Sequence, residues 1–139
     1  MTTPVIYGML RIKNEARWID EVLQSILPIC ERVFVLDDHS TDGTPDLCEW
    51  IDRRVTVYRS IFGGLDESRD KNYLLSRIVE HVPIGCLDDV EAPYWALMVD
   101  GDEVLHPSGR TAIPDFCRAT SAVAAKLPIW YLWNRRDQR

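Results

Sequence analysis

Four short runs of apolar residues recur along the chain, at residues 5–10, 33–36, 55–58 and 94–99. Each run is too continuous for a strand that keeps one face in water. Continuous apolar runs of this length are typical of strands in a parallel sheet that is covered on both faces. The pattern therefore predicts four buried strands.

Helical patterns fill the gaps between these runs. Apolar residues recur every three or four positions over 18–27, with Asn14 as the expected N-cap. A short second helix is expected where Pro45 occupies an early helical position, and a third over 66–81. The alternation of strand and helix predicts an α/β layered fold with right-handed crossovers, in which helices flank a mostly parallel sheet.

The pattern is weaker after Asp102, where we expect a short helix at 113–120 and a strand at 122–133. A length of 139 residues suits a single domain, 1–139. The last apolar stretch stops in a run of charges, without a cap. We therefore expect the domain to be the N-terminal part of a longer protein.

Composition narrows the possible partners and the compartment. The net charge of −6 leaves no basic surplus for broad nucleic-acid binding, although one phosphorylated small molecule needs only a few local cations. The four cysteines form no CxxC pair, which favours free thiols in a reducing compartment over a zinc site. With neither a secretory pattern nor an apolar run of 18 residues, we expect a cytoplasmic protein, with peripheral membrane association left open.

Charged residues follow three of the predicted strands. Arg11 and Glu15 follow the first, Asp38 follows the second, and Asp100 and Asp102 follow the fourth. Ligands of open parallel α/β sheets bind in the crevice at the carboxyl ends of the strands. The sequence thus predicts a ligand site at one edge of the sheet.

The Asp100-Gly-Asp102 segment is the strongest candidate for a metal site. Two aspartates at i and i+2 in extended backbone point the same way and can share one hard cation, such as Mg²⁺ or Mn²⁺. An isolated DxD is more often a solvated turn. Its position directly after a buried strand favours the cation here.

Asp37 to Thr44, DDHSTDGT, allows two interpretations. The spacing from Asp38 to Glu49 fits an EF-hand loop, but the preceding RVFVL predicts a strand where an EF-hand needs a helix. We favour a strand-to-helix turn in which Gly43 permits the tight path. Asp38 would then face the crevice, where it could accept hydrogen bonds from a base N–H or from ribose hydroxyls.

The segment ESRDKNYLL puts Arg69 and Lys71 in the first two turns of the third predicted helix. They can be part of a solvated helix face with a few salt bridges. They can also supply positive charge to a phosphate, helped by the helix N-terminus.

Four stretches in this order resemble family 2 glycosyltransferases of the GT-A fold: MLRIKNEARWIDEVLQSIL, VFVLDDHSTDGT, ESRDKNYLL and MVDGDE. The resemblance covers essentially the whole chain. It implies a GT-A type, Rossmann-like fold that binds a nucleotide-diphosphate-sugar donor, with Mg²⁺ or Mn²⁺ bridging the diphosphate to the DxD motif. By the same resemblance Asp38 contacts base or ribose, Asp100 contacts ribose or a metal-bound water, and Asp102 binds the metal. It places Arg11, Glu15, Lys71 and, beside them, Arg69 in the nucleotide pocket.

The chemistry implied by the resemblance is inverting transfer to an acceptor hydroxyl, with a carboxylate as general base. That base normally comes from an acceptor-side half, well after the DxD motif. The only carboxylates after Glu103 are Asp115 and Asp137, and neither lies in a context like the base motif. The catalytic base is therefore unassigned, and we expect the chain to be the donor-binding half.

Two other functions stay open. A nucleotidyltransferase that makes a sugar nucleotide usually has a glycine-rich, basic loop after its first strand, whereas RIKNEARW has no glycine. A non-catalytic nucleotide-sugar-binding module would keep the donor site and need no base. The donor base and sugar, the acceptor and the oligomeric state are not determined by the sequence.

Overall fold

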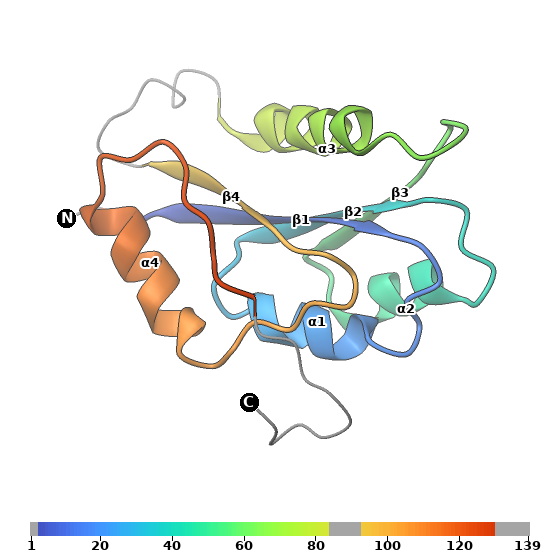
Figure 1. Cartoon of the computed structure of the whole chain (residues 1–139), viewed down its shortest axis with the longest axis horizontal. Helices are drawn as coiled ribbons and strands as arrows, with labels where there is room; N and C mark the ends of the chain where they lie inside the picture. The colour runs from blue at the N-terminus through green and yellow to red at the C-terminus, as the bar shows by residue number, and fades with distance from the viewer. Residues whose placement is uncertain (1–2, 84–92, 130–139) are drawn as a thin grey trace.

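The structure is a computed structural model that describes residues 3–83 and 93–129. Strands and helices alternate along the chain (Figure 1). Their order is β1 (Val5–Ile12), α1 (Ile19–Ile26), β2 (Arg32–Asp37), α2 (Thr44–Ile51), β3 (Val55–Arg59), α3 (Glu67–His81), β4 (Tyr94–Met98) and α4 (Gly109–Ala119). All four predicted strands form, but only β1 and β2 are buried along most of their length. The prediction of burial is wrong for much of β3 and β4, which are partly exposed because they lie at the two edges of the sheet. Within these ranges, no helix is both long and apolar enough to span a bilayer.

The four strands form one all-parallel sheet in the order β3-β2-β1-β4. Gly8 at the centre of β1 lies opposite Val33 of β2 and Leu97 of β4. The chain steps outward from β1 to β3, and α3 then carries it back across the sheet to β4. The strand order thus reverses between β1 and β4, which makes this the topological switch point of the sheet.

Helices cover both faces of the sheet, with α3 on one side and α1, α2 and α4 on the other (Figure 1). Leu10 and Ile12 of β1 face the side of α1, whereas Tyr7 and Met9 face α3. Alternate residues of one strand therefore enter two different cores, which explains why the central strands β1 and β2 are mostly apolar. The α/β layered fold expected from the sequence is confirmed.

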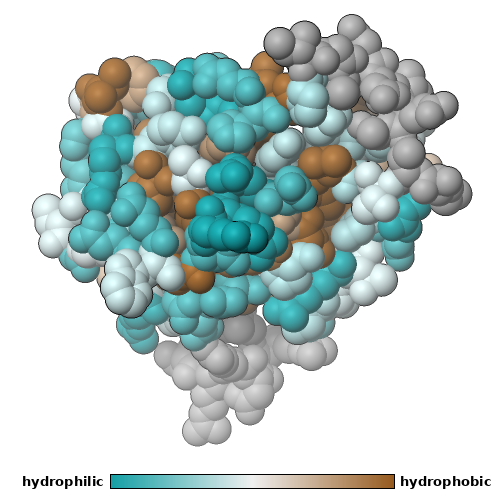
Figure 2. All heavy atoms as spheres, turned by 180° about the vertical axis from the view of Figure 1, so that it is seen from behind, coloured by the Kyte–Doolittle hydropathy of each residue, from teal (hydrophilic) through white to brown (hydrophobic). Residues whose placement is uncertain are grey.

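The surface away from these cores is mixed. Figure 2 views the molecule from behind and shows apolar side chains of the described residues as separate patches between polar ones. Trp50, Ile61 and Leu65 are among the exposed large apolar residues. Isolated exposed apolar residues of this kind are normal for a globular domain.

Three local predictions need correction. Asn14 is not the N-cap of α1, because the helix begins after Trp18 and Asn14 instead has a left-handed backbone with φ 55°. The helix expected at 113–120 begins earlier, at Gly109. The expected strand at 122–133 is wrong over 122–129, where no strand forms; its remaining residues lie outside the described part of the chain.

The failed strand has a physical reason. Val123 is 99% exposed, and Leu127 and Ile129 are also exposed, so this apolar stretch packs against no core here. A strand needs a neighbour to pair with and a surface to pack on, and apolar composition alone supplies neither.

Candidate functional site

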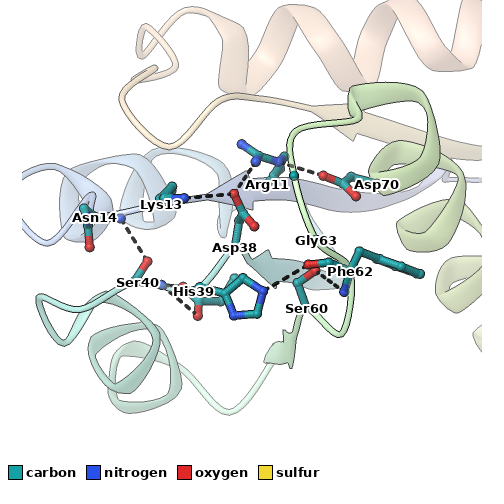
Figure 3. A network of polar contacts seen from close by, with 12 residues as sticks. Arg11, Lys13, Asn14, Asp38, His39, Ser40, Ser60, Phe62, Gly63 and Asp70 are labelled. Carbon is teal, nitrogen blue, oxygen red and sulfur yellow. Dashed lines mark hydrogen bonds and ion pairs between the residues drawn. The ribbon is translucent and has the colours of Figure 1, made fainter.

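Hydrogen bonds between two loops hold together the carboxyl ends of β1 and β2. The Asn14 N–H donates to Ser40 Oγ at 2.9 Å (Figure 3), and the Thr41 N–H donates to Asn14 Oδ1 at 2.8 Å. The Asp38 N–H donates to the carbonyl oxygen of Ile12 at 2.9 Å. Asparagine tolerates the left-handed conformation that this reciprocal contact requires. The strand ends are therefore a fixed platform.

A second pair of contacts joins the β1–α1 loop to the start of α2. The Ala16 N–H donates to Asp42 Oδ2 at 3.0 Å, and the Glu15 N–H donates to Thr44 Oγ1 at 2.9 Å. A hydrogen bond from the Thr44 hydroxyl, helped by backbone amides, lowers the pKa of the Asp42 carboxyl. Gly43 has φ 81°, so the predicted strand-to-helix turn is confirmed. The EF-hand interpretation is excluded, because a strand enters the loop.

Two buried carboxylates, those of Asp38 and Asp70, both bind Arg11 at the carboxyl end of the sheet. Arg11 Nη2 donates to Asp38 Oδ2 at 2.5 Å, and Arg11 Nε donates to Asp70 Oδ2 at 2.8 Å (Figure 3). Asp38 is 6% exposed and Asp70 is 1% exposed. Lys13 Nζ lies 3.4 Å from Asp38 Oδ2. Charge pairing offsets the large cost of burying these carboxylates.

Arg69 points toward the β3–α3 loop and toward Asp70. Its Nε donates to Asp70 Oδ1 at 2.9 Å, while Nη1 and Nη2 donate to the carbonyl oxygens of Gly63 and Gly64 at 3.1 and 3.0 Å. Its guanidinium also lies 4.5 Å above the ring of Phe62. All three guanidinium nitrogens therefore have protein partners.

Lys71 lies on the exposed side of α3, where its Nζ pairs with Glu67 Oε2 at 3.2 Å. This i, i+4 pair is solvent-exposed and contributes little to stability. Lys71 is available to other partners at a small cost.

The DxD segment forms a tight turn after β4. The Asp100 N–H donates to Glu103 Oε2 at 2.9 Å, and the Glu103 N–H donates back to the Asp100 carbonyl oxygen at 3.1 Å. Gly101 packs directly on Glu15, since a Cβ at this position would lie 2.7 Å from Glu15 Cγ. The turn is thus seated against the β1–α1 loop at the switch point.

The carboxylates of Glu15, Asp42, Asp100 and Asp102 lie near enough for their charges to repel. Burial raises the pKa of Glu15, and the charges of Asp102, Asp42 and Asp100 raise it further, in that order. A divalent cation would relieve this repulsion, and carboxylate oxygens are what Mg²⁺ and Mn²⁺ prefer. No group of three or more His, Cys, Asp or Glu side chains is arranged to hold a metal ion in the described ranges. Asp100 and Asp102 could thus supply only part of a coordination shell.

Five of the seven predicted site residues form two groups, whereas Arg69 joins the first of them only through Asp70 and Lys71 pairs with Glu67 instead. Arg11 and Asp38 are in direct contact, and Glu15 lies with the DxD turn. Sequence reasoning did not find Asp70. Its signal was a charge on the apolar stripe of α3, because Asp70 lies at i with the buried Leu74 and Ile78 at i+4 and i+8.

A shallow hollow of about 340 Å³ lies beside this site on α2. Its lining residues are Asp42, Gly43, Asp46, Leu47 and Trp50. None of them is cationic, so the hollow suits a phosphate ligand less well than the strand ends do.

The sequence matches no known protein-family model, and a search of curated proteins finds no relative of this chain. The family 2 glycosyltransferase resemblance stays a prediction that rests on the motifs.

Proposed function

We propose that this chain is the donor-binding domain of a metal-dependent, inverting glycosyltransferase that uses a nucleotide-diphosphate-sugar. The observation that carries the proposal is the gathering of complementary charge at the topological switch point. Arg11 and Asp38 lie at the ends of β1 and β2, and the DxD turn lies at the end of β4. This crevice is where open α/β sheets bind nucleotides.

In this proposal the β1–β2 side of the site receives the nucleoside. The Asp38 carboxylate would accept hydrogen bonds from a base N–H or from ribose hydroxyls. Arg11 uses Nε and Nη2 for Asp70 and Asp38, and its Nη1 makes no hydrogen bond to any described residue. That nitrogen can donate to an oxygen of the ligand.

The β4 side would receive the diphosphate. Asp100 and Asp102 would hold Mg²⁺ or Mn²⁺, and the Glu15 side chain packed on Gly101 would keep the turn in place. The bound cation would supply charge neutralisation for the departing diphosphate. Lys71 and Arg69, on the first turns of α3, would add positive potential to the pocket.

A calorimetric titration with UDP, GDP and dTDP, each with and without Mn²⁺, tests the proposal. We expect one nucleotide to bind only when Mn²⁺ is present, and Asp102→Asn to weaken that binding by more than about tenfold. Asp115→Asn is the matched control, because it removes the same charge from an exposed side chain on α4 whose one ion pair among the described residues is with Arg118. Failure of the folded wild-type protein to bind any nucleotide would contradict the proposal.

Sugar transfer separates the proposed enzyme from its alternatives. A nucleotidyltransferase would release diphosphate from a nucleoside triphosphate, which we do not expect here. A binding module would bind the donor without transferring sugar, even when the chain is joined to an acceptor-binding half. Transfer by such a longer protein would exclude the binding module.

A further inference from the structure

One buried carboxylate, that of Asp70, is divided between two arginines. Its Oδ2 accepts from Arg11 Nε at 2.8 Å, and its Oδ1 accepts from Arg69 Nε at 2.9 Å. The residue is 1% exposed, so it has almost no contact with solvent. Charge-assisted hydrogen bonds at such a place are strong and fix the geometry of both partners.

The two arginines belong to different walls of the site. Arg11 extends from β1 and binds Asp38, which follows β2. Arg69 lies on α3 and donates to the carbonyl oxygens of Gly63 and Gly64 in the β3–α3 loop. Asp70 therefore links the strand ends to this loop, because it pairs with Arg11 on one side and with Arg69 on the other, and Arg69 donates to the loop carbonyl oxygens. Figure 3 shows the contacts of Arg11 with Asp38 and Asp70.

Asp70 also determines which part of Arg11 faces outward. With Nε held by Asp70 and Nη2 held by Asp38, the planar guanidinium is fixed at two points. The side chain of Arg11 is 21% exposed, and Nη1 has no hydrogen-bond partner among the described residues. A guanidinium held in this way loses little freedom when a ligand binds it.

We propose that Asp70 is a positioning residue of the nucleotide site. It does not touch the ligand; it orients Arg11 so that Nη1 meets an oxygen of a bound nucleoside diphosphate. The inference rests on the proposed function for the identity of that ligand. It goes beyond the motifs, none of which assigns a role to Asp70.

Asp70→Asn separates positioning from a simple charge effect. The amide keeps the shape of the side chain but replaces one acceptor oxygen with an NH₂ group, so one arginine must face a donor. The change also removes one negative charge, so the network becomes more positive by one unit. Added positive charge would tighten the binding of an anionic diphosphate, whereas loss of the Arg11 orientation weakens it. The two explanations therefore predict opposite signs.

The first experiment is a double-mutant cycle of nucleotide affinity with Asp70→Asn and Arg11→Met, in the presence of Mn²⁺. We expect Asp70→Asn to weaken binding about tenfold in the wild-type background, within the range of coupling inside one ion-pair network. It should change binding by less than about twofold when Arg11 is already replaced. Asp115→Asn serves as the control. Equal weakening in both backgrounds, or tighter binding by Asp70→Asn, would overturn the inference.

The second measurement needs no ligand and tests directly whether Asp70 holds the Arg11 side chain. In ¹⁵N NMR spectra of the wild type, the Arg11 Nε–H should exchange slowly with water, and in Asp70→Asn it should exchange at least about tenfold faster. Unchanged exchange would overturn the positioning role while leaving the proposed function intact. Protected Arg11 in a wild-type protein that binds no nucleotide would contradict the proposed function and leave Asp70 a purely structural residue.

Discussion

The glycine inside the DxD turn offers a test of how the site is built. A Cβ at Gly101 would lie 2.7 Å from Glu15 Cγ and 3.2 Å from Ile12 Cγ2. Gly101 does not have a left-handed backbone, so alanine meets no backbone strain there. Gly101→Ala therefore probes side-chain contacts, of which the one with Glu15 is the closer.

Two effects of opposite sign determine the outcome. Forcing a methyl group into a packed contact costs about 1–3 kcal/mol, whereas Gly→Ala at a compatible backbone gains about 0.4–1 kcal/mol by restricting the unfolded chain. The hydrogen bond from the Glu15 N–H to Thr44 Oγ1 at 2.9 Å fixes the backbone of Glu15, so its Cγ can move away only by a change of side-chain rotamer. We expect a net loss of about 0.5–2 kcal/mol in the free energy of unfolding.

The effect of Gly101→Ala on the free energy of unfolding should change sign when the Glu15 side chain is shortened. In a Glu15→Ala background the 2.7 Å contact no longer exists, and the nearest obstacle is Ile12 Cγ2 at 3.2 Å. The entropic term then dominates, and Gly101→Ala should be neutral or stabilising by up to about 1 kcal/mol.

The four proteins to compare are the wild type, Gly101→Ala, Glu15→Ala and the double variant. Their free energies of unfolding in urea at pH 7 give the coupling between the two positions. Each kcal/mol should also appear as a shift of about 3–4 °C in Tm. An equal loss in both backgrounds would show that Ile12 or the backbone, and not Glu15, restricts the turn. Stabilisation by Gly101→Ala in the wild-type background would refute the close packing itself.

Three further predictions concern stability. Burial, followed by the nearby carboxylates, raises the pKa of Glu15 above its ordinary value of 4.5. Between 4.5 and the raised pKa, the folded state binds more protons than the unfolded state. The free energy of unfolding therefore falls as the pH rises through that window. Glu15→Gln should therefore stabilise the protein at pH 7 relative to pH 4, and a pH-independent difference in Tm would contradict this. Arg54→Met removes the hydrogen bonds that Arg54 Nη1 donates to the carbonyl oxygens of Leu27 and Cys30, just after α1, at 2.9 and 3.1 Å. We expect a loss of about 1–2 kcal/mol in the free energy of unfolding, measured in urea. No loss would mean that water replaces the guanidinium as the donor to these carbonyl oxygens. Phe34→Ala empties a fully buried position beneath α3 and should cost about 3–5 kcal/mol by the same assay; a loss under 1 kcal/mol would show that this core is loosely packed.

Local sequence patterns determined the secondary structure wherever tertiary packing reinforced them. The continuous apolar runs gave the strands, since a strand covered on both faces must be apolar at every position. The residues that follow β1, β2 and β4 could be assigned to one edge because parallel strands share a direction. That inference needs no knowledge of strand order.

The strand order itself came only from the structure. The apolar runs of β1 and β3 look alike, so nothing in them shows that β1 is central and that β4 returns to its free side. The residues near Val123 show in the same way that an apolar run alone does not determine structure. They are apolar, but they form no strand because no neighbouring strand pairs with them.

The finer parts of the site were also decided by tertiary contacts. Asp70 is 59 positions from Arg11 in the sequence, and Gly101 meets Glu15 only because β4 pairs with β1. The sequence determined which chemical groups reach the edge of the sheet, because that depends on periodicity and direction. Which groups pair with one another depends on long-range packing, and only the tertiary structure could decide it.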